Sequence, residues 1–201
     1  MPDDVSPGED RERITLGPQN LRGLAHPLRL RLLGLLREDG PSTATKLAER
    51  VGQSSGATSY HLRQLADYGF ITEDPERTNA GRERWWKAAH RSTDLPKAEI
   101  RETPLETEGF LRALAAELYH KIDAFITELQ TMPEEWDESS TLSDTMLRLT
   151  AEEATELRRE LHDLMRRYRE DRPGVEAPAG AERVILQVQL MPELRANEST
   201  T

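Results

Sequence analysis

The stretch TATKLAERVGQSSGATSYHLRQLADY, residues 43–68, carries the strongest structural signal in the chain. Apolar and small side chains recur at helical spacing up to Gly52, where glycine allows the backbone to turn sharply. Ser54 or Ser55 can then cap a second helix, because a serine hydroxyl accepts a hydrogen bond from a backbone N–H of the first turn. The stretch therefore predicts two helices joined by a tight turn, either a helix-turn-helix or an ordinary helical hairpin with a solvated polar face.

The second helix has an apolar face formed by Ala57, Leu62, Leu65 and Ala66. Its remaining side chains are small and polar or basic, and in a helix-turn-helix such side chains approach base edges and phosphates. The candidate DNA contacts from this segment are Gln53, Ser54, Ser55, Thr58, Ser59, His61 and Arg63.

A predicted β-hairpin follows the second helix. Residues 70–72 and 85–88 favour short strands, and the loop between them is rich in turn residues and arginines. Directly after a helix-turn-helix, such a hairpin is typical of the wing of a winged helix, whose arginines contact the phosphate backbone or the minor groove. The alternative is a solvated hairpin with no partner. The candidate contacts are Arg77, Arg82 and Arg84.

The segment before residue 43 predicts a tail followed by helices. Residues 1–16 are acidic and contain prolines, so we expect a disordered tail. Pro27 suits the first turn of a strongly apolar helix. His26, at the junction, has no partner in the neighbouring sequence and is expected to be structural rather than a ligand.

The run LRGLAHPLRLRLLGLL, the helix-turn-helix stretch and the segment GRERWW together resemble the DNA-binding domain of ArsR-like bacterial transcriptional regulators. The resemblance spans residues 20–90. It implies that residues 53–63 enter the major groove, that the protein is a homodimer on a two-fold symmetric operator, and that it regulates transcription, commonly by repression.

Metal sensing, which many members of that family perform, is not expected here. The chain has no cysteine, and no two of its five histidines are at chelating spacing. His120 and Asp123 lie one helical turn apart and could hold a metal only with further ligands from a second protomer. We therefore expect no metal ligands and no cofactor.

The net charge of −10 is unevenly distributed along the chain. Residues 21–97 carry thirteen basic and nine acidic side chains, net +4, whereas residues 98–201 carry twelve and twenty-three, net −11. The predicted helix-turn-helix thus lies in the only net-positive segment, as a nucleic-acid-binding half requires.

The second half of the chain predicts a helical module. We expect a winged helix-turn-helix domain over residues 17–92, a linker over 93–107, a helical domain over 108–192 ending in a strand at 184–190, and a tail over 193–201. A capping box at Thr150 and Glu153 opens the last long helix. An apolar seam on the first long helix is expected to dimerise the protein, through Leu111, Leu114, Leu118, Ile122, Phe125 and Leu129.

The predicted fold class is therefore mainly α with a small β-hairpin wing. The function that fits is a cytoplasmic, homodimeric regulator of transcription that binds double-stranded DNA, with an unknown small-molecule effector as a further candidate partner. The alternative is a winged-helix protein-interaction module with an acidic docking domain. No motif indicates an enzyme, and no apolar run approaches the length that spans a membrane.

Overall fold

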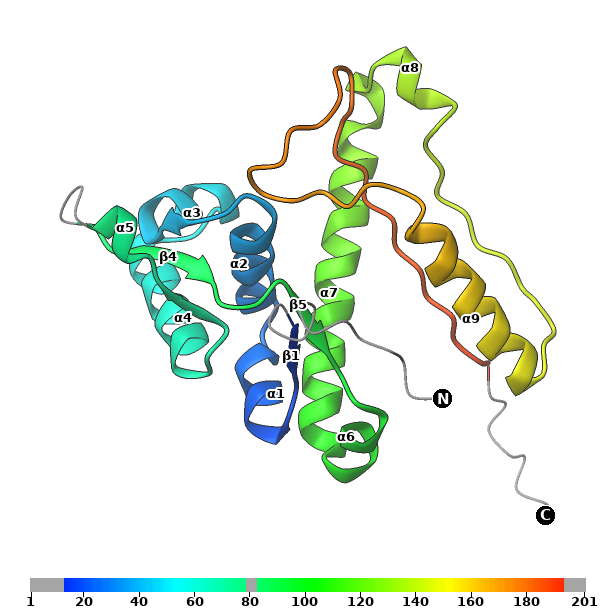
Figure 1. Cartoon of the computed structure of the whole chain (residues 1–201), viewed down its shortest axis with the longest axis horizontal. Helices are drawn as coiled ribbons and strands as arrows, with labels where there is room; N and C mark the ends of the chain where they lie inside the picture. Colours follow the sequence, from blue (N-terminus) through cyan, green and yellow to red (C-terminus); the bar gives the residue numbers. More distant parts are fainter. Residues whose placement is uncertain (1–12, 79–82, 194–201) are drawn as a thin grey trace. The chain divides into compact units, whose positions relative to one another are not determined.

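A computed structural model of the chain describes residues 13–78 and 83–193. The chain divides into two compact units, with the boundary between Leu129 and Gln130. Figure 1 shows the course of the elements within each unit. The fold is mainly helical, with a small antiparallel sheet after the helix-turn-helix and a long helix following it, which confirms the predicted fold class for the first unit.

The first unit is built around a leucine-rich core. Its helices are α1 (Pro18–Leu24), α2 (Pro27–Glu38), α3 (Ala44–Val51), α4 (Ser55–Asp67), α5 (Pro75–Thr78), α6 (Lys97–Glu102) and α7 (Pro104–Glu128). Helix α7 packs against α1 and α2, and α3 packs against α4. The fully buried side chains of the core include Leu21, Leu24, Leu32, Leu33, Leu47, Leu62, Leu65 and Phe70.

His26 has the structural role that the sequence predicts. It is the N-cap of α2, and its Nδ1 accepts a hydrogen bond from the backbone N–H of Leu28 at 3.1 Å. Pro27 occupies the first turn, where the missing N–H costs no hydrogen bond. The junction between α1 and α2 is therefore fixed by local side-chain chemistry.

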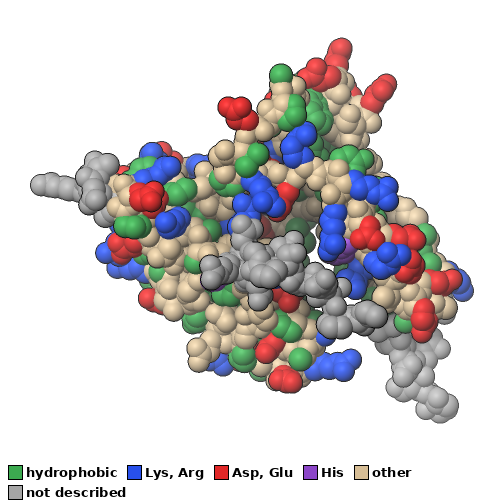
Figure 2. Space-filling view, viewed as in Figure 1, with side chains coloured by type: hydrophobic (Ala, Val, Ile, Leu, Met, Phe, Trp, Pro, Cys, Tyr) green, Lys and Arg blue, Asp and Glu red, His purple; other side chains and the backbone are tan. Residues whose placement is uncertain are grey.

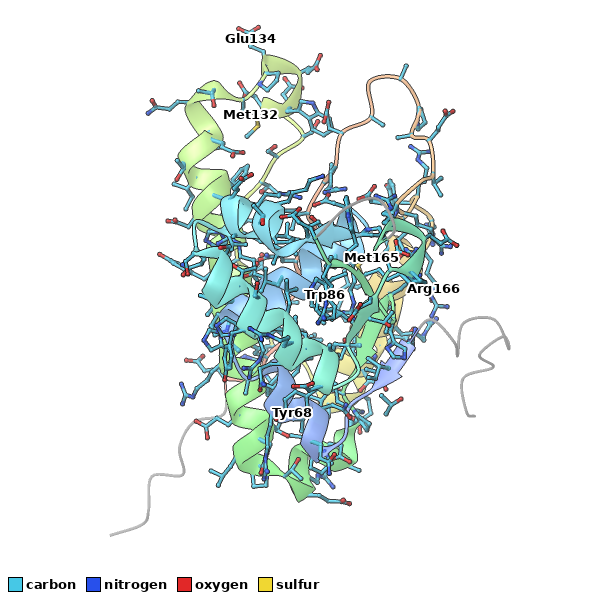
Figure 3. The ribbon with its side chains drawn as sticks, turned by 90° about the vertical axis from the view of Figure 1, so that its left-hand side faces the viewer. Tyr68, Trp86, Met132, Glu134, Met165 and Arg166 are labelled. Carbon is cyan, nitrogen blue, oxygen red and sulfur yellow. The ribbon has the colours of Figure 1, made fainter. Side chains whose placement is uncertain are left out.

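The predicted wing is present and has an additional strand. Strands β3 (Ile71–Glu73) and β4 (Trp85–Ala88) pair antiparallel, with Thr72 opposite Lys87. The short strand β2 (Ser42–Thr43), which directly precedes α3, pairs with the other edge of β4. Trp86, which is labelled in Figure 3, is 5% exposed and belongs to the core of the first unit, so it anchors the sheet to that core.

Two segments that the sequence analysis assigns to a tail and a linker are ordered elements. Strand β1 (Arg13–Thr15) pairs in parallel with β5 (Ser92–Asp94), and Leu16 is 1% exposed. The prediction of a disordered tail is wrong for residues 13–16, because this pairing joins positions far apart in sequence and leaves no local pattern. Arg37 on α2 donates hydrogen bonds to the His90 carbonyl and to Thr93 Oγ1, both at 2.9 Å, and burial lowers the pKa of Arg37 to about 10.

The predicted linker over residues 93–107 is likewise wrong. It contains β5, α6 and the start of α7, because proline begins helices as readily as it ends them: Pro104 is in the first turn of α7. Thr107 is buried, and its hydroxyl donates to the Glu99 carbonyl at 3.2 Å, which ties α7 to α6.

The second unit, from residue 130 onward, has no fully buried residue among those that the structure describes. It contains the end of the 3-10 turn Leu129–Thr131, and helices α8 (Glu134–Asp137) and α9 (Ala151–Met165). The capping box of α9 is confirmed: Thr150 Oγ1 accepts from the Glu153 N–H, and Glu153 accepts from the Thr150 N–H. The predicted strand at 184–190 is wrong: in the part of the chain that the structure describes, these residues form no strand and join neither sheet.

Within the described ranges, no helix combines the length and the apolar character needed to cross a membrane.

Candidate nucleic-acid interface

Helices α3 and α4 are fixed at three points by local residues, one at the start of α3 and two in the turn between the helices. Thr43 Oγ1 caps α3 by accepting from the Lys46 N–H at 3.4 Å. Gly52 ends α3 in the left-handed region, with φ at 65°. Ser54 Oγ caps α4 by accepting from the Ala57 N–H at 3.2 Å. These contacts set the angle at which α4 leaves the domain.

The outer face of α4 exposes most of the polar side chains that the sequence analysis selects. Gln53, Ser54, Ser55 and Arg63 are exposed, and Ser59 is half-buried. The Nε of Arg63 donates to the Ser59 carbonyl at 3.2 Å, which holds the guanidinium along the helix. This face therefore offers hydroxyl and guanidinium donors at the surface of one helix.

Thr58 does not belong to that face. Its side chain is fully buried, and its hydroxyl has no hydrogen-bond partner among the described residues. The prediction of direct DNA contact is wrong for Thr58, because it lies four residues before Leu62 and seven before Leu65, on the inner stripe of α4. This spacing from the two leucines is visible in the sequence and already places Thr58 on the inner face of the helix.

His61 also points partly inward, toward His26. The two imidazole rings are 4.5 Å apart between centroids and tilted by 43°, and Tyr60 meets His61 edge-on at 5.3 Å. Burial lowers the pKa of His61, and the nearby His26 and Arg29 lower it further. Burial and Arg29 likewise lower the pKa of His26. Both shifts favour the neutral form of these two histidines.

The histidine pair predicts an acid-sensitive domain. Because both pKa values are lower in the folded state than in the unfolded state, the unfolded chain binds more protons as the pH falls below about 6.5. We expect the free energy of unfolding to decrease between pH 7 and pH 5.5, and His61→Gln to reduce this decrease. Urea denaturation at a series of pH values measures it. An equal decrease in the wild type and His61→Gln would contradict the assignment.

Three cationic side chains lie over the rings of the two tryptophans of the wing. Lys46 Nζ lies 4.7 Å from the centroid of the Trp85 ring and the Arg77 guanidinium lies 5.2 Å from it, while Arg84 lies 5.4 Å from the Trp86 ring. These cation–π contacts restrict the long side chains and position their charges. Lys46, from α3, was not selected from the sequence, because its proximity to the wing follows only from the fold.

Two of these cations, Arg77 and Arg84, also form ion pairs with carboxylates of the wing. Arg84 forms an exposed ion pair with Glu73 at 3.2 Å, and Arg77 lies 3.7 Å from the buried Asp74. Figure 2 shows basic and acidic side chains intermixed at the end of the first unit that carries α5. The predicted contact Arg82 lies outside the described residues.

A cavity of about 400 Å³ lies where α3, α4 and the wing meet. It brings together Arg63 from α4 and Arg84 from the wing, which the sequence analysis placed in two separate motifs. Thr45, in the first turn of α3, contributes a hydroxyl. The two guanidinium groups and the hydroxyl are hydrogen-bond donors. Among the described residues, no three metal-ligating side chains are grouped to hold an ion.

Comparison with known proteins supports the helix-turn-helix assignment. The family described as a helix-turn-helix domain matches residues 24–74, which span α2, α3, α4 and β3. Among solved structures, an apo mutant of ZitR from Lactococcus lactis is 20% identical, with 75% of this chain and 86% of that chain covered at a TM-score of 0.29. No curated protein matches. Residues 24–74 of the chain therefore form a helix-turn-helix domain.

Proposed function

We propose that the protein is a sequence-specific transcriptional regulator, without enzymatic activity, that binds a two-fold symmetric operator as a homodimer and represses the genes it controls. The observation that carries the proposal is the exposed polar face of α4 beside a wing with positioned cations. A helix of this kind fits the major groove of B-DNA, where each base pair presents a distinct pattern of donors and acceptors.

Arg63 is the side chain best suited to select a base. It is exposed on α4, and its anchored Nε leaves the Nη groups to donate to the O6 and N7 acceptors of guanine. The hydroxyls of Ser54, Ser55 and Ser59 are short enough to let the helix approach closely. Thus α4 supplies the base contacts.

The wing and α3 supply backbone contacts. Lys46, Arg77 and Arg84 lie over the two tryptophan rings of the wing, and the exposed ion pair of Arg84 with Glu73 can be exchanged for phosphate oxygens. Such contacts set the affinity and orientation of a protein on DNA but carry no base sequence.

Helix α7 provides the surface for the second copy. Leu114 differs from the other residues of the predicted seam. It packs against the core of the first unit, near the buried Phe110 and Ala113. The other residues of the predicted seam, together with Ala115, are spaced alternately four and three residues apart along the chain. None of them is fully buried. This heptad spacing is typical of a coiled-coil seam, and its members are Leu111, Ala115, Leu118, Ile122, Phe125 and Leu129.

An apolar groove marks the start of this seam. Leu111 and Ala115 line it together with Ile100 and Pro104, and Leu111 and Ile100 are exposed. A helix-turn-helix protein needs a second copy to reach half-sites about 34 Å apart. We infer that two α7 helices pair along this seam.

The proposal is tested by selection from a random pool of duplexes, with the full chain as bait. We expect enrichment of a sequence with two inverted half-sites, and repression of a reporter that carries this sequence in its promoter. Enrichment of no sequence would contradict the proposal and favour the protein-interaction module.

A further inference from the structure

The cavity between α3, α4 and the wing contains a carboxylate that the DNA-binding account does not use. Glu83 lines the cavity, and its Oε1 accepts a hydrogen bond from Thr45 Oγ1 at 2.7 Å. Arg63 and Arg84 line the same cavity. A carboxylate therefore lies among the donors that would otherwise be available to an anion.

The chemistry of the cavity is that of a phosphate site. The Arg84 guanidinium and the Thr45 hydroxyl line it, and a phosphate group offers oxygen acceptors that match both. The cavity is also placed at the junction of α4 and the wing, where the backbone of a duplex held by α4 would run. Glu83 provides the same kind of acceptor, an anionic oxygen, from the protein itself.

The second arginine is held in a similar way. Arg84 is paired with Glu73 at 3.2 Å, and both side chains are about half exposed. Both of these phosphate-binding groups thus have an internal acceptor: Glu83 for Thr45 and Glu73 for Arg84.

We propose that Glu83 occupies, in the DNA-free protein, the position of a backbone phosphate, and that DNA displaces it from Thr45 on binding. This inference rests on the proposed function. Because one anionic acceptor replaces another on the Thr45 hydroxyl, the exchange adds little net affinity for any duplex. Base contacts from α4 then decide which sequence is bound, and Glu83 is a residue that keeps binding to random DNA weak.

The experiment measures dissociation constants of the full chain for two labelled duplexes, one selected from a random pool and one of scrambled sequence. Glu83→Ala is expected to tighten binding to both duplexes about fivefold, because phosphate no longer competes with the carboxylate. Glu76→Ala is the matched control, since it removes an exposed carboxylate from the same region without opening the cavity. It should tighten binding by about twofold or less.

A second substitution separates displacement from general electrostatics. Thr45→Val removes the shared donor and keeps the side-chain shape. In the wild type it should change affinity by less than about twofold, because the hydroxyl has an anionic partner both with and without DNA. In the Glu83→Ala background it should weaken binding about fivefold, because only the DNA-bound state then offers an anionic partner.

Three results would overturn the inference. Glu83→Ala could bind no more tightly than Glu76→Ala, or Thr45→Val could have the same effect in both backgrounds. A loss of affinity by Glu83→Ala for the selected duplex alone would instead make Glu83 a reader of cytosine. If the wild-type protein selects no duplex, the proposed function fails, and this outcome is distinct from the other three.

Discussion

Ile122→Glu is expected to convert the proposed dimer into monomers and to weaken binding to a two-fold symmetric operator by about a hundredfold. Ile122 lies near the centre of the proposed heptad seam of α7 and is not among the residues that pack in the core of the first unit. A glutamate on each copy would bring two like charges into an apolar interface. A monomer lacks the second DNA-binding domain. It therefore loses the gain in affinity that comes from linking two binding domains, which is commonly a factor of about a hundred or more.

Sedimentation velocity and fluorescence anisotropy measure the two effects separately. Ala124→Glu is the matched control: it adds the same charge on the same turn of α7, at an exposed position outside the seam. It should leave the dimer intact. The dimer proposal would be contradicted by an Ile122→Glu protein that sediments as the wild type does. A monomer that still binds the operator with full affinity would contradict the two-fold account of the operator.

Gly23→Ala is expected to destabilise the first unit by about 2–3 kcal/mol, although alanine is the better helix former. A methyl group at this position of α1 would lie 2.6 Å from Tyr68 Cγ and 2.9 Å from Phe70 Cε2. Phe70 is fully buried, and the Tyr68 carbonyl accepts from the Asn20 amide at 3.2 Å, so neither residue can yield easily. Figure 3 shows Tyr68 at the end of α4.

Gly34→Ala is expected to change the free energy of unfolding in the opposite direction. Gly34 is in the interior of α2, and its nearest neighbour to an added methyl group is Glu38 Oε1 at 3.8 Å, an ordinary contact. We expect it to stabilise the protein by about 0.5–1 kcal/mol through helix propensity. Urea denaturation of both variants measures the difference. A Gly23→Ala protein as stable as the wild type would show that α1 and the end of α4 are less closely packed than the structure indicates.

The helix-turn-helix could be predicted because its determinants are local. Gly52, the Ser54 cap and the apolar spacing of α4 each act within a few residues, and the structure contains all of them. The wing strands follow from short β-favouring runs on either side of turn residues. The structure changes only the details, with the short helix α5 after β3 and the third strand β2 at the edge.

The remaining elements depend on contacts between distant residues. Strand β1 is short, and only its pairing with β5 identifies it. The prolines at positions 96 and 104 precede or begin α6 and α7, and a reading of proline as a breaker alone places a linker there. The face of α7 that meets α1 and α2 could not be distinguished from the outer seam, because both are apolar.

The candidate site was predicted in outline for a similar reason. Helical periodicity identifies an outer face of α4, but it did not separate Thr58 and His61 from their exposed neighbours. The convergence of Arg63, Arg84 and Thr45 on one cavity, and the contact of Lys46 with Trp85, arise only when α3, α4 and the wing are assembled.

The central claim, that α4 reads DNA sequence, is tested most directly by anisotropy with a selected and a scrambled duplex at two salt concentrations, for the wild type and Arg63→Ala. We expect the wild type to prefer the selected duplex and to lose at least about a hundredfold in affinity between 50 and 200 mM salt. Arg63→Ala should remove much of the preference while retaining the salt dependence. Equal, weak and salt-insensitive binding to both duplexes by the wild type would contradict the account.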